Sequence, residues 1–242
     1  MLKADLHVHT DWSDSRSSVK QVLEAASQKG LDGVAITDHN TMRGAQEALR
    51  AGRRLLIIPG EEVKTMQGEI LALGITEPLP GGSDVEETID GIHSQGGIAV
   101  APHPTVPLLH TLPTSLLYAL PLDAVEVFSA ITPLAWRYAR KNVMLARSLG
   151  LPMVAGSDSH HHATVGDAYT LIDAEAGSLD AVLKAVKAGR TMVGFSPSRL
   201  VYKLHILVEF LEPPTAVPRR IRNSILRLTL PSSKHGNLAR KP

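Results

Sequence analysis

Short apolar runs recur along the first 200 residues of this chain, and segments of helical periodicity separate most of them. Each run has the length and the β-branched content of a buried strand. The runs are LKADLHVH at 2–9, GVAIT at 33–37, LLIIPGEEV at 55–63, IAVAP at 98–102, AVEVFSA at 124–130, MVAGS at 153–157 and AYTLI at 168–172. This alternation predicts an α/β fold of about six or seven successive βα units.

Two residue pairs are spaced as capping boxes, which mark where helices begin. Ser18 precedes Gln21 by three positions, and Ser83 precedes Glu86 by three. In a capping box each of the two side chains accepts a hydrogen bond from the backbone N–H of the other residue. A third helix is predicted after Ser178, where apolar residues recur at helical spacing. We therefore expect helices directly after these three serines.

Periodicity alone fits either a (β/α) barrel or a doubly wound sheet. The ionisable residues favour the barrel, because catalytic groups in barrels collect at the carboxyl ends of the strands. Histidine or carboxylate side chains end five of the apolar runs: His7 and His9, Asp38 and His39, Glu61 and Glu62, His103, and Asp158 and His160. Side chains two positions apart on a strand point to the same face, so each residue pair of this spacing can converge on one centre.

A shared cation is the simplest compensation for so many ionisable groups at buried strand ends. One such histidine alone is more often structural than a ligand, but five such endings in one chain indicate a metal site. The chain has no cysteine, which excludes disulfides, thiolate ligands and a cysteine nucleophile. Nitrogen and oxygen ligands would therefore hold any metal.

Six motifs also occur together in a recognisable order. They are HVHT at 7–10, SD at 13–14, TDHN at 37–40, PGEEV at 59–63, APHP at 101–104 and GSDSH at 156–160. As a set they resemble the PHP (polymerase and histidinol phosphatase) family over about residues 1–200. The resemblance implies a distorted (β/α)7 barrel with a metal site at the C-terminal ends of the strands, and phosphoester hydrolysis with two or three divalent ions (Mn, Zn or Fe). Residues 201–242 would form a basic C-terminal extension.

The resemblance also implies which residues hold the ions. The first ion would be held by His7, His9, Glu62 and Asp158. The second would be held by Asp14, His39 and His160. Glu62 would bridge to a third ion held by His103. Family members often carry a histidine where this chain has Glu69, and a carboxylate there would make the third site favour harder metals or leave it weak or empty.

Two adjacent glutamates, Glu61 and Glu62, compete for the bridging position. The family pattern Gly-x-Glu selects Glu62, and strand alternation would then turn Glu61 away from the metals. Glu62, Asp158 and His160 are the predicted catalytic residues, and the nucleophile would be a water that the metals activate for in-line attack on phosphorus. No protein nucleophile is required.

Three residues near these motifs are interpreted as non-ligands. His161 and His162 extend the run after His160, and we expect them to line the pocket or face solvent. His160 or His161 is also a candidate acid for the leaving alkoxide, as is a metal-activated water. Arg43 follows the TDHN motif and could grip phosphate, but a surface helix arginine is the simpler interpretation.

Charge and composition restrict the function further. The chain has 242 residues, 43% hydrophobic content and a formal net charge of +1, which suits a globular protein with a sizeable core. It has no secretory leader pattern and no apolar run of membrane-spanning length, so we expect a cytoplasmic protein without a membrane partner. Residues 203–242 hold eight basic against two acidic residues, which indicates a solvated tail or a phosphate-rich partner.

These features together favour a metal-dependent phosphoesterase acting on a small phosphorylated metabolite or nucleotide. Three alternatives stay open. A nuclease of the same family could bind nucleic acid through the basic tail, although the tail lacks the aromatic residues that stack on single strands. An amidohydrolase-type enzyme also begins with His-x-His, but it normally needs a bridging lysine, and no lysine is expected to end a central strand here. An inactive binding module would lack ligands, whereas all but one of the family ligand positions carry the expected residue.

Overall fold

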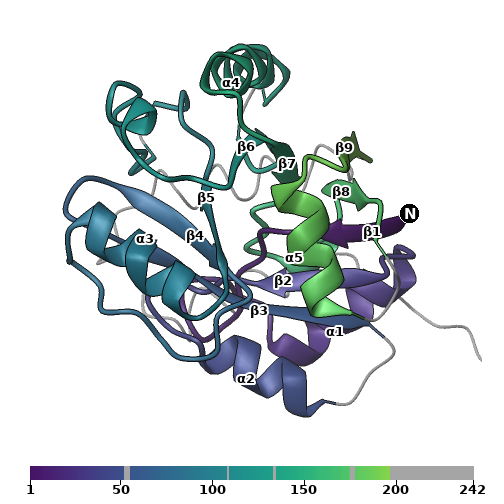
Figure 1. Ribbon diagram of the computed structural model, residues 1–242. Coiled ribbons are helices and arrows are strands. Elements are labelled where there is room, and N and C mark those ends of the chain that lie inside the picture. The colour runs from purple at the N-terminus through teal and green to yellow at the C-terminus, as the bar shows by residue number, and fades with distance from the viewer. Residues whose placement is uncertain (52–54, 108, 133–134, 175–177, 197–242) are drawn as a thin grey trace, which may run out of the picture. The chain divides into compact units, whose positions relative to one another are not determined.

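The computed structural model describes residues 1–51, 55–107, 109–132, 135–174 and 178–196 (Figure 1). The predicted basic extension, residues 201–242, lies outside the described residues. Among the described helices, none combines the length and the apolar character needed to cross a membrane.

One nine-stranded sheet forms the centre of the described chain, in the order β7-β6-β5-β4-β3-β2-β1-β8-β9. Its strands are β1 (Leu2–Asp5), β2 (Gly33–Ile36), β3 (Leu56–Lys64), β4 (Glu69–Leu73), β5 (Ile98–Ala101), β6 (Ala124–Ser129), β7 (Met153–Gly156), β8 (Ala168–Ile172) and β9 (Thr191–Phe195). Parallel pairing joins β1 to β2, β2 to β3, β5 to β6 and β6 to β7. β4 is antiparallel to β3 and β5, and β8 is antiparallel to β1 and β9.

Side-chain hydrogen bonds link β7 to β8 and β9, strands that are not its neighbours in the sheet order. Thr170 Oγ1 accepts a bond of 2.9 Å from the N–H of Ala155 and donates one of 2.9 Å to the carbonyl of the same residue. Thr191 Oγ1 donates a bond of 2.8 Å to the carbonyl of Met153. The sheet is therefore a nearly closed barrel, which confirms the predicted barrel-like α/β fold.

All seven predicted runs form strands, and the sheet contains two more strands that were not predicted. β4 follows β3 through a short turn, and antiparallel neighbours need no helix between them, so a search for βα units misses it. β9 leaves most of its apolar side chains exposed, so it lacks the pattern of a buried strand. The first run also ends earlier than predicted: β1 stops at Asp5, and an isolated bridge then pairs Val8 with Ser159.

The described residues form five α-helices: α1 (Val19–Gln28), α2 (Arg43–Arg50), α3 (Val85–Ser94), α4 (Ala135–Leu149) and α5 (Leu179–Lys187). The predicted capping box of Ser18 and Gln21 is confirmed, and Ser178 caps α5 as predicted. The prediction for Ser83 is wrong, because the next residue, Asp84, is the N-cap of α3. Its carboxylate accepts a first-turn N–H and also suits the positive end of the helix dipole.

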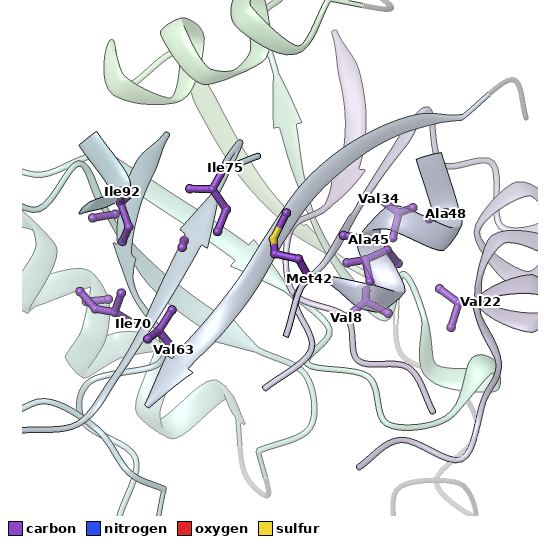
Figure 2. Packing of buried hydrophobic residues seen from close by; sticks show 14 of the residues in the cluster. Val8, Val22, Val34, Met42, Ala45, Ala48, Val63, Ile70, Ile75 and Ile92 are labelled. Carbon is purple, nitrogen blue, oxygen red and sulfur yellow. The ribbon is translucent and has the colours of Figure 1, made fainter. Parts of the chain in front are cut away.

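Apolar side chains on the outer face of the sheet pack against the helices (Figure 2). Ala45 and Ala48 of α2 lie beside Val34 of β2, and Val63 of β3 packs in the same cluster with Ile70 of β4. Successive strand residues point to opposite faces. Because Val63 faces the helices, the residue before it faces the interior of the barrel.

A second apolar cluster fills the interior at the amino ends of the strands. Leu2, Ile98 and Ala124, the first residues of β1, β5 and β6, belong to it, and α5 contributes Val182 and Val186. α5 therefore packs into the barrel at its amino end. The carboxyl end is left for polar side chains.

Candidate metal centre

The carboxyl end of the barrel brings all nine predicted ligand residues into one cluster. Each belongs to at least one group of side chains whose ligand atoms lie within 4.8 Å of one another. The groups are His7, His9 and Glu62; His7, His103 and Asp158; Glu62, Glu69 and His103; and His9, Asp14, His39 and His160. The structure thus brings these nine side chains together, although its groups differ in part from the predicted ones: Asp158 groups with His7 and His103, and His9 also joins the group of Asp14.

Glu62 lies at the middle of the cluster. Its Oε2 atom is 3.3 Å from His7 Nε2, 3.4 Å from His9 Nε2 and 3.3 Å from His39 Nδ1. Its Oε1 atom is 3.5 Å from His103 Nε2. One carboxylate therefore contacts four imidazoles, and its side chain is 2% exposed.

Asp158 makes a second set of contacts with three of these histidines. Its Oδ1 atom is 3.2 Å from His9 Nε2 and 3.6 Å from His7 Nε2, and its Oδ2 atom is 3.8 Å from His103 Nε2. Asp158 and His103 both have left-handed backbones, with φ of 52° and 58°. Such conformations are unfavourable for residues other than glycine and occur often at functional sites.

Asp14 lies at the exposed edge of the cluster, with its side chain 50% exposed. Its Oδ2 atom is 3.2 Å from His160 Nε2 and 3.5 Å from His39 Nε2. Asp38 holds the loop that carries Asp14, because its carboxylate accepts hydrogen bonds of 2.6 Å from the Thr10 N–H and 2.8 Å from the Ser13 hydroxyl. Asp38 is thus an anchor for the loop and does not belong to the ligand groups.

Glu69 reaches the cluster because β4 runs antiparallel to β3, which pairs its first residue with Lys64, the last residue of β3. Its Oε1 atom is 3.7 Å from His39 Nδ1 and 3.8 Å from Lys64 Nζ. The expectation that no lysine ends a central strand is therefore wrong. The apolar run was read as ending at Val63, one residue before the strand does.

Neighbouring groups of opposite charge set the pKa values of the cluster residues. Burial opposes the protonation of His7, but the carboxylates of Asp158, Glu62 and Glu126 outweigh it and raise the pKa of His7 well above its usual value. Burial also opposes the ionisation of Glu62, but the charge of His7 and a hydrogen bond from His103 hold the pKa of Glu62 well below its usual value. The central carboxylate is therefore ionised and able to bind a cation.

Several buried atoms of the cluster have no hydrogen-bond partner among the described residues. They are His9 Nδ1, His39 Nδ1, Glu62 Oε1 and His103 Nδ1. Leaving a buried polar atom unpaired costs free energy, so native proteins rarely do it without a reason. Divalent ions would satisfy such lone pairs, because imidazole nitrogens and carboxylate oxygens are common ligands of divalent ions. The residues present therefore fit a centre of divalent ions.

Two buried carboxylates that support the histidines were not predicted. Glu126 of β6 places Oε1 3.2 Å from His7 Nδ1. Asp5 accepts hydrogen bonds from the N–H groups of His7, Ser157 and Gly166, which join the end of β1 to the segment after β7. Burial raises the pKa of Asp5 to about 6. The signal in the sequence was one charged residue inside each of the apolar runs AVEVFSA and ADLHVH.

Glu61 points away from the cluster, as strand alternation predicts. Its Oε1 atom accepts a hydrogen bond of 2.6 Å from the N–H of Leu79, and its Oε2 atom has no partner among the described residues. The side chain is fully buried. Burial raises the pKa of Glu61 to about 7.

Replacing Glu61 by glutamine is expected to change how stability depends on pH. Folded Glu61 keeps a proton up to about pH 7, whereas the unfolded chain releases it near the usual value of 4.5. Wild-type protein therefore loses this part of its stability as pH rises through that interval, and Glu61→Gln does not. Melting temperatures should match most closely near pH 4, with the variant gaining by pH 8. A difference in melting temperature between variant and wild type that stays the same at all pH values would contradict this prediction.

The two histidines after His160 have structural partners. His161 Nδ1 accepts a hydrogen bond of 3.2 Å from the N–H of Ala163. His162 Nδ1 lies 3.1 Å from Ser17 Oγ, and the N–H of His162 donates to the same oxygen at 2.7 Å. Both residues are half-buried and do not belong to the ligand groups, and His162 joins the segment after β7 to the loop that carries Asp14.

Two family models match the chain. The model described as "PHP domain" matches residues 5–102, and the model described as "PHP-associated" matches residues 134–191. The first span contains the cluster residues from His7 to Glu69, and the second contains Asp158 and His160. His103 lies one residue beyond the first span.

Two proteins with similar sequences illustrate the range of relatives. An uncharacterized protein of Methanocaldococcus jannaschii is 41% identical over 142 residues, which cover 53% of this chain and 82% of that protein. A phosphoribosyl 1,2-cyclic phosphate 1,2-diphosphodiesterase of Eggerthella lenta is 39% identical over 84 residues, which cover 31% of this chain and 32% of that enzyme.

A solved structure has a similar fold. It is a two-domain protein from Bacteroides vulgatus that contains a predicted PHP-like metal-dependent phosphoesterase. The TM-score is 0.68 at 22% identity, and the match covers 80% of this chain and 64% of that chain. This chain therefore corresponds to less than two thirds of that protein.

Proposed function

This chain belongs to the PHP domain family, and on that premise we propose that it hydrolyses phosphoesters of small phosphorylated metabolites or nucleotides with two or three divalent ions. The observation that carries the proposal is the position of Glu62. Its two oxygens lie within 3.5 Å of four imidazoles at the open end of the barrel. A carboxylate with both oxygens among nitrogen ligands is suited to bridge two ions.

The proximity groups suggest one ion for each region of the cluster. We assign a first ion to His7, His9, Glu62 and Asp158. A second is assigned to Asp14, His39 and His160, with His9 beside it. A third is assigned to Glu62, Glu69 and His103. Glu62 and His9 lie between neighbouring groups, so the ions would be close enough to act on one phosphate.

Divalent ions supply Lewis acidity toward the phosphate oxygens and lower the pKa of the water that attacks phosphorus. The side chains of this protein determine where that chemistry takes place. His160 Nδ1 lies 3.0 Å from the carbonyl oxygen of Asp158, so an N–H there gives Nε2 the lone pair, on the side of Asp14. Glu126 likewise contacts His7 at Nδ1. An N–H at that nitrogen leaves the lone pair of His7 on Nε2, which lies beside Glu62.

The geometry favours this function over an amidohydrolase-type reaction. Glu62 is the residue proposed for the bridging position, and Lys64 contacts the edge of the cluster at Glu69 instead of its centre. A nuclease of the same family and an inactive binding module are separated from the proposal by experiment. The nuclease would act on oligonucleotide ends, and the binding module would release no phosphate from any substrate.

A phosphate-release screen on protein of defined metal content tests the proposal. The substrates are histidinol phosphate, nucleoside monophosphates, bisphosphorylated nucleotides and oligonucleotides with terminal phosphates. Hydrolysis of one of the first three classes would support a small-molecule phosphoesterase. A nuclease would shorten the oligonucleotides and release nucleotides instead of inorganic phosphate, so shortening of the oligonucleotides alone would favour the nuclease. No turnover with any class at full metal occupancy would contradict both.

The third ion gives a prediction about Glu69. Glu69→Ala should lose about one ion per chain in elemental analysis, because two ligands hold a divalent ion weakly. Glu69→His should keep the ion and shift preference from Mn toward Zn, since imidazole is a softer donor than carboxylate. If the alanine variant binds as many ions as wild type, Glu69 is not a ligand.

Lys64→Met provides the matched control for that experiment. The ammonium of Lys64, 3.8 Å from Glu69 Oε1, competes with an ion for the same oxygen. Its removal should leave the ion count unchanged and tighten the weakest site. Equal losses in Glu69→Ala and Lys64→Met would instead indicate a general disturbance of the β3–β4 turn.

A further inference from the structure

Trp12 is an exposed tryptophan in the loop that supplies Asp14 to the cluster. The indole is 43% exposed, although tryptophan is usually highly buried. Its backbone N–H donates a hydrogen bond of 3.3 Å to Thr10 Oγ1, and the Thr10 hydroxyl donates one of 2.7 Å to Asp38. The loop is therefore fixed to the segment that also carries His39. Trp12 and Asp14 are both exposed and lie two residues apart in this loop.

Helix α2 holds the indole ring in one orientation. The Nε1–H of Trp12 donates a hydrogen bond of 2.8 Å to Glu47 Oε2, and the guanidinium of Arg43 lies 5.6 Å from the ring centroid. Arg43 and Glu47 are four residues apart, so both are on one face of the helix. Arg43 is the first residue of α2, which follows the carboxyl end of β2, so this turn of the helix is at the same end of the barrel as the cluster.

Gly44 makes the contact between this helix turn and the loop close. A Cβ atom at residue 44 would lie 2.0 Å from Asp38 Oδ2 and 2.7 Å from Thr10 Oγ1. Only glycine allows that approach. The first turn of α2 is thus packed against Thr10 and Asp38, and the hydrogen bond to Glu47 ties the ring to the same helix.

We propose that Trp12 is the platform on which a planar aromatic ring of the substrate stacks while the phosphate lies at the cluster. The inference rests on the proposed function for the position of the phosphate. Indole stacking is favourable with any aromatic ring, and it contributes most when the indole is already held in place. Arg43 is thereby assigned to the support of the ring, which agrees with its interpretation as a surface helix arginine. The substrate class is a phosphoester whose alcohol carries a nucleobase or a ring of similar size.

Two ligands that differ only by the ring test this assignment. Adenosine 5′-monophosphate and ribose 5-phosphate carry the same phosphate on the same sugar carbon. Their dissociation constants are measured by calorimetry on metal-loaded protein under conditions without turnover. Wild-type protein should bind the nucleotide about 5-fold more tightly or better, the lower end of what one stacked base contributes. Trp12→Leu should abolish the difference, and Trp12→Phe should retain most of it.

Tyr118→Leu is the matched control. Tyr118 is 62% exposed, and its hydroxyl lies 2.9 Å from Ser148 Oγ in the last turn of α4, close to the amino end of β7. The Tyr118→Leu substitution should leave the ratio of the two dissociation constants unchanged. A ratio near one in wild type, or a Trp12→Leu loss that is equal for both ligands, would overturn the platform even if phosphate release is found. A ratio that follows Trp12 in a protein without hydrolysis would instead overturn the proposed function alone.

To separate a nucleobase from a simpler aryl group, 2-phenylethyl phosphate is compared with 2-cyclohexylethyl phosphate in the same variants. Preference for the phenyl compound that depends on Trp12 would extend the assignment to aryl esters. Preference that appears only with adenosine would restrict it to rings of nucleobase size. Each of these results supports stacking on Trp12. If the preference for the aromatic ligand does not depend on Trp12 in either pair of ligands, stacking on Trp12 is contradicted.

Discussion

Glu62→Gln is expected to lower phosphate release by more than about a hundredfold, whereas Glu61→Gln should change it by less than about threefold. Residues that only orient metal ligands are already worth about 10-fold to 100-fold, and Glu62 contacts four imidazoles of the cluster directly. An amide keeps the size of the side chain but removes the negative charge and one anionic donor. The proposed bridge between ions should therefore be lost without a change in side-chain volume.

The adjacent residue Glu61 provides a matched control for Glu62→Gln. Glu61 and Glu62 are both buried, belong to the same strand and change by the same atoms when replaced by glutamine. They differ in direction, since Glu61 accepts the N–H of Leu79 behind the strand. Elemental analysis and thermal denaturation should accompany the rates. Equal losses, or a larger loss at Glu61, would show that the inner face of β3 has been assigned wrongly.

Glu126→Gln is expected to weaken metal binding and lower phosphate release by about 10-fold to 100-fold. The Glu126 carboxylate is 3.2 Å from His7 Nδ1, so it holds His7 in the orientation that presents Nε2 to the centre. Burial raises the pKa of Glu126, although the charge of His7 opposes this. An amide can still accept the N–H of His7 but no longer makes the imidazole more basic.

Glu126 acts through His7, so its test needs a readout beyond the rate. Metal titration should show a weaker first ion, and saturating metal should restore most of the activity of Glu126→Gln. Activity that stays low at saturating metal, with normal affinity for the ion, would contradict a positioning role. Glu61→Gln again serves as the control for a buried carboxylate outside the cluster.

Much of the fold and of the candidate site could be predicted from the sequence, because the relevant signals are local. The apolar runs are short, and five of the seven end in residue types that are costly to bury, so His7, His9, His103 and Asp158 mark their strands and one end of the barrel together. Alternation within β3 then separates Glu62 from Glu61 without any three-dimensional information. Such a pattern depends only on the period of a strand.

The rest of the candidate site depends on contacts between distant segments, and hydrophobic periodicity does not specify such contacts. Glu69 joins the cluster only because β4 turns back along β3, and Asp14 only because Asp38 fixes its loop. Both positions came from the resemblance of motifs. Glu126 was missed because one carboxylate within AVEVFSA has the same pattern whether it faces solvent or the barrel. Val125 and Val127 pack against α4, which leaves Glu126 facing inward.

The direct test of a multi-ion phosphoesterase centre is a titration of metal-depleted protein with Mn²⁺, in which phosphate release and bound metal per chain are measured on the same samples. We expect no release without metal, because the described cluster contains ligands and no Ser/His or Cys/His nucleophile is proposed. The rate should rise as ions bind and reach a plateau at two or three ions per chain. Full activity in protein shown by elemental analysis to hold no metal would contradict this function for the cluster.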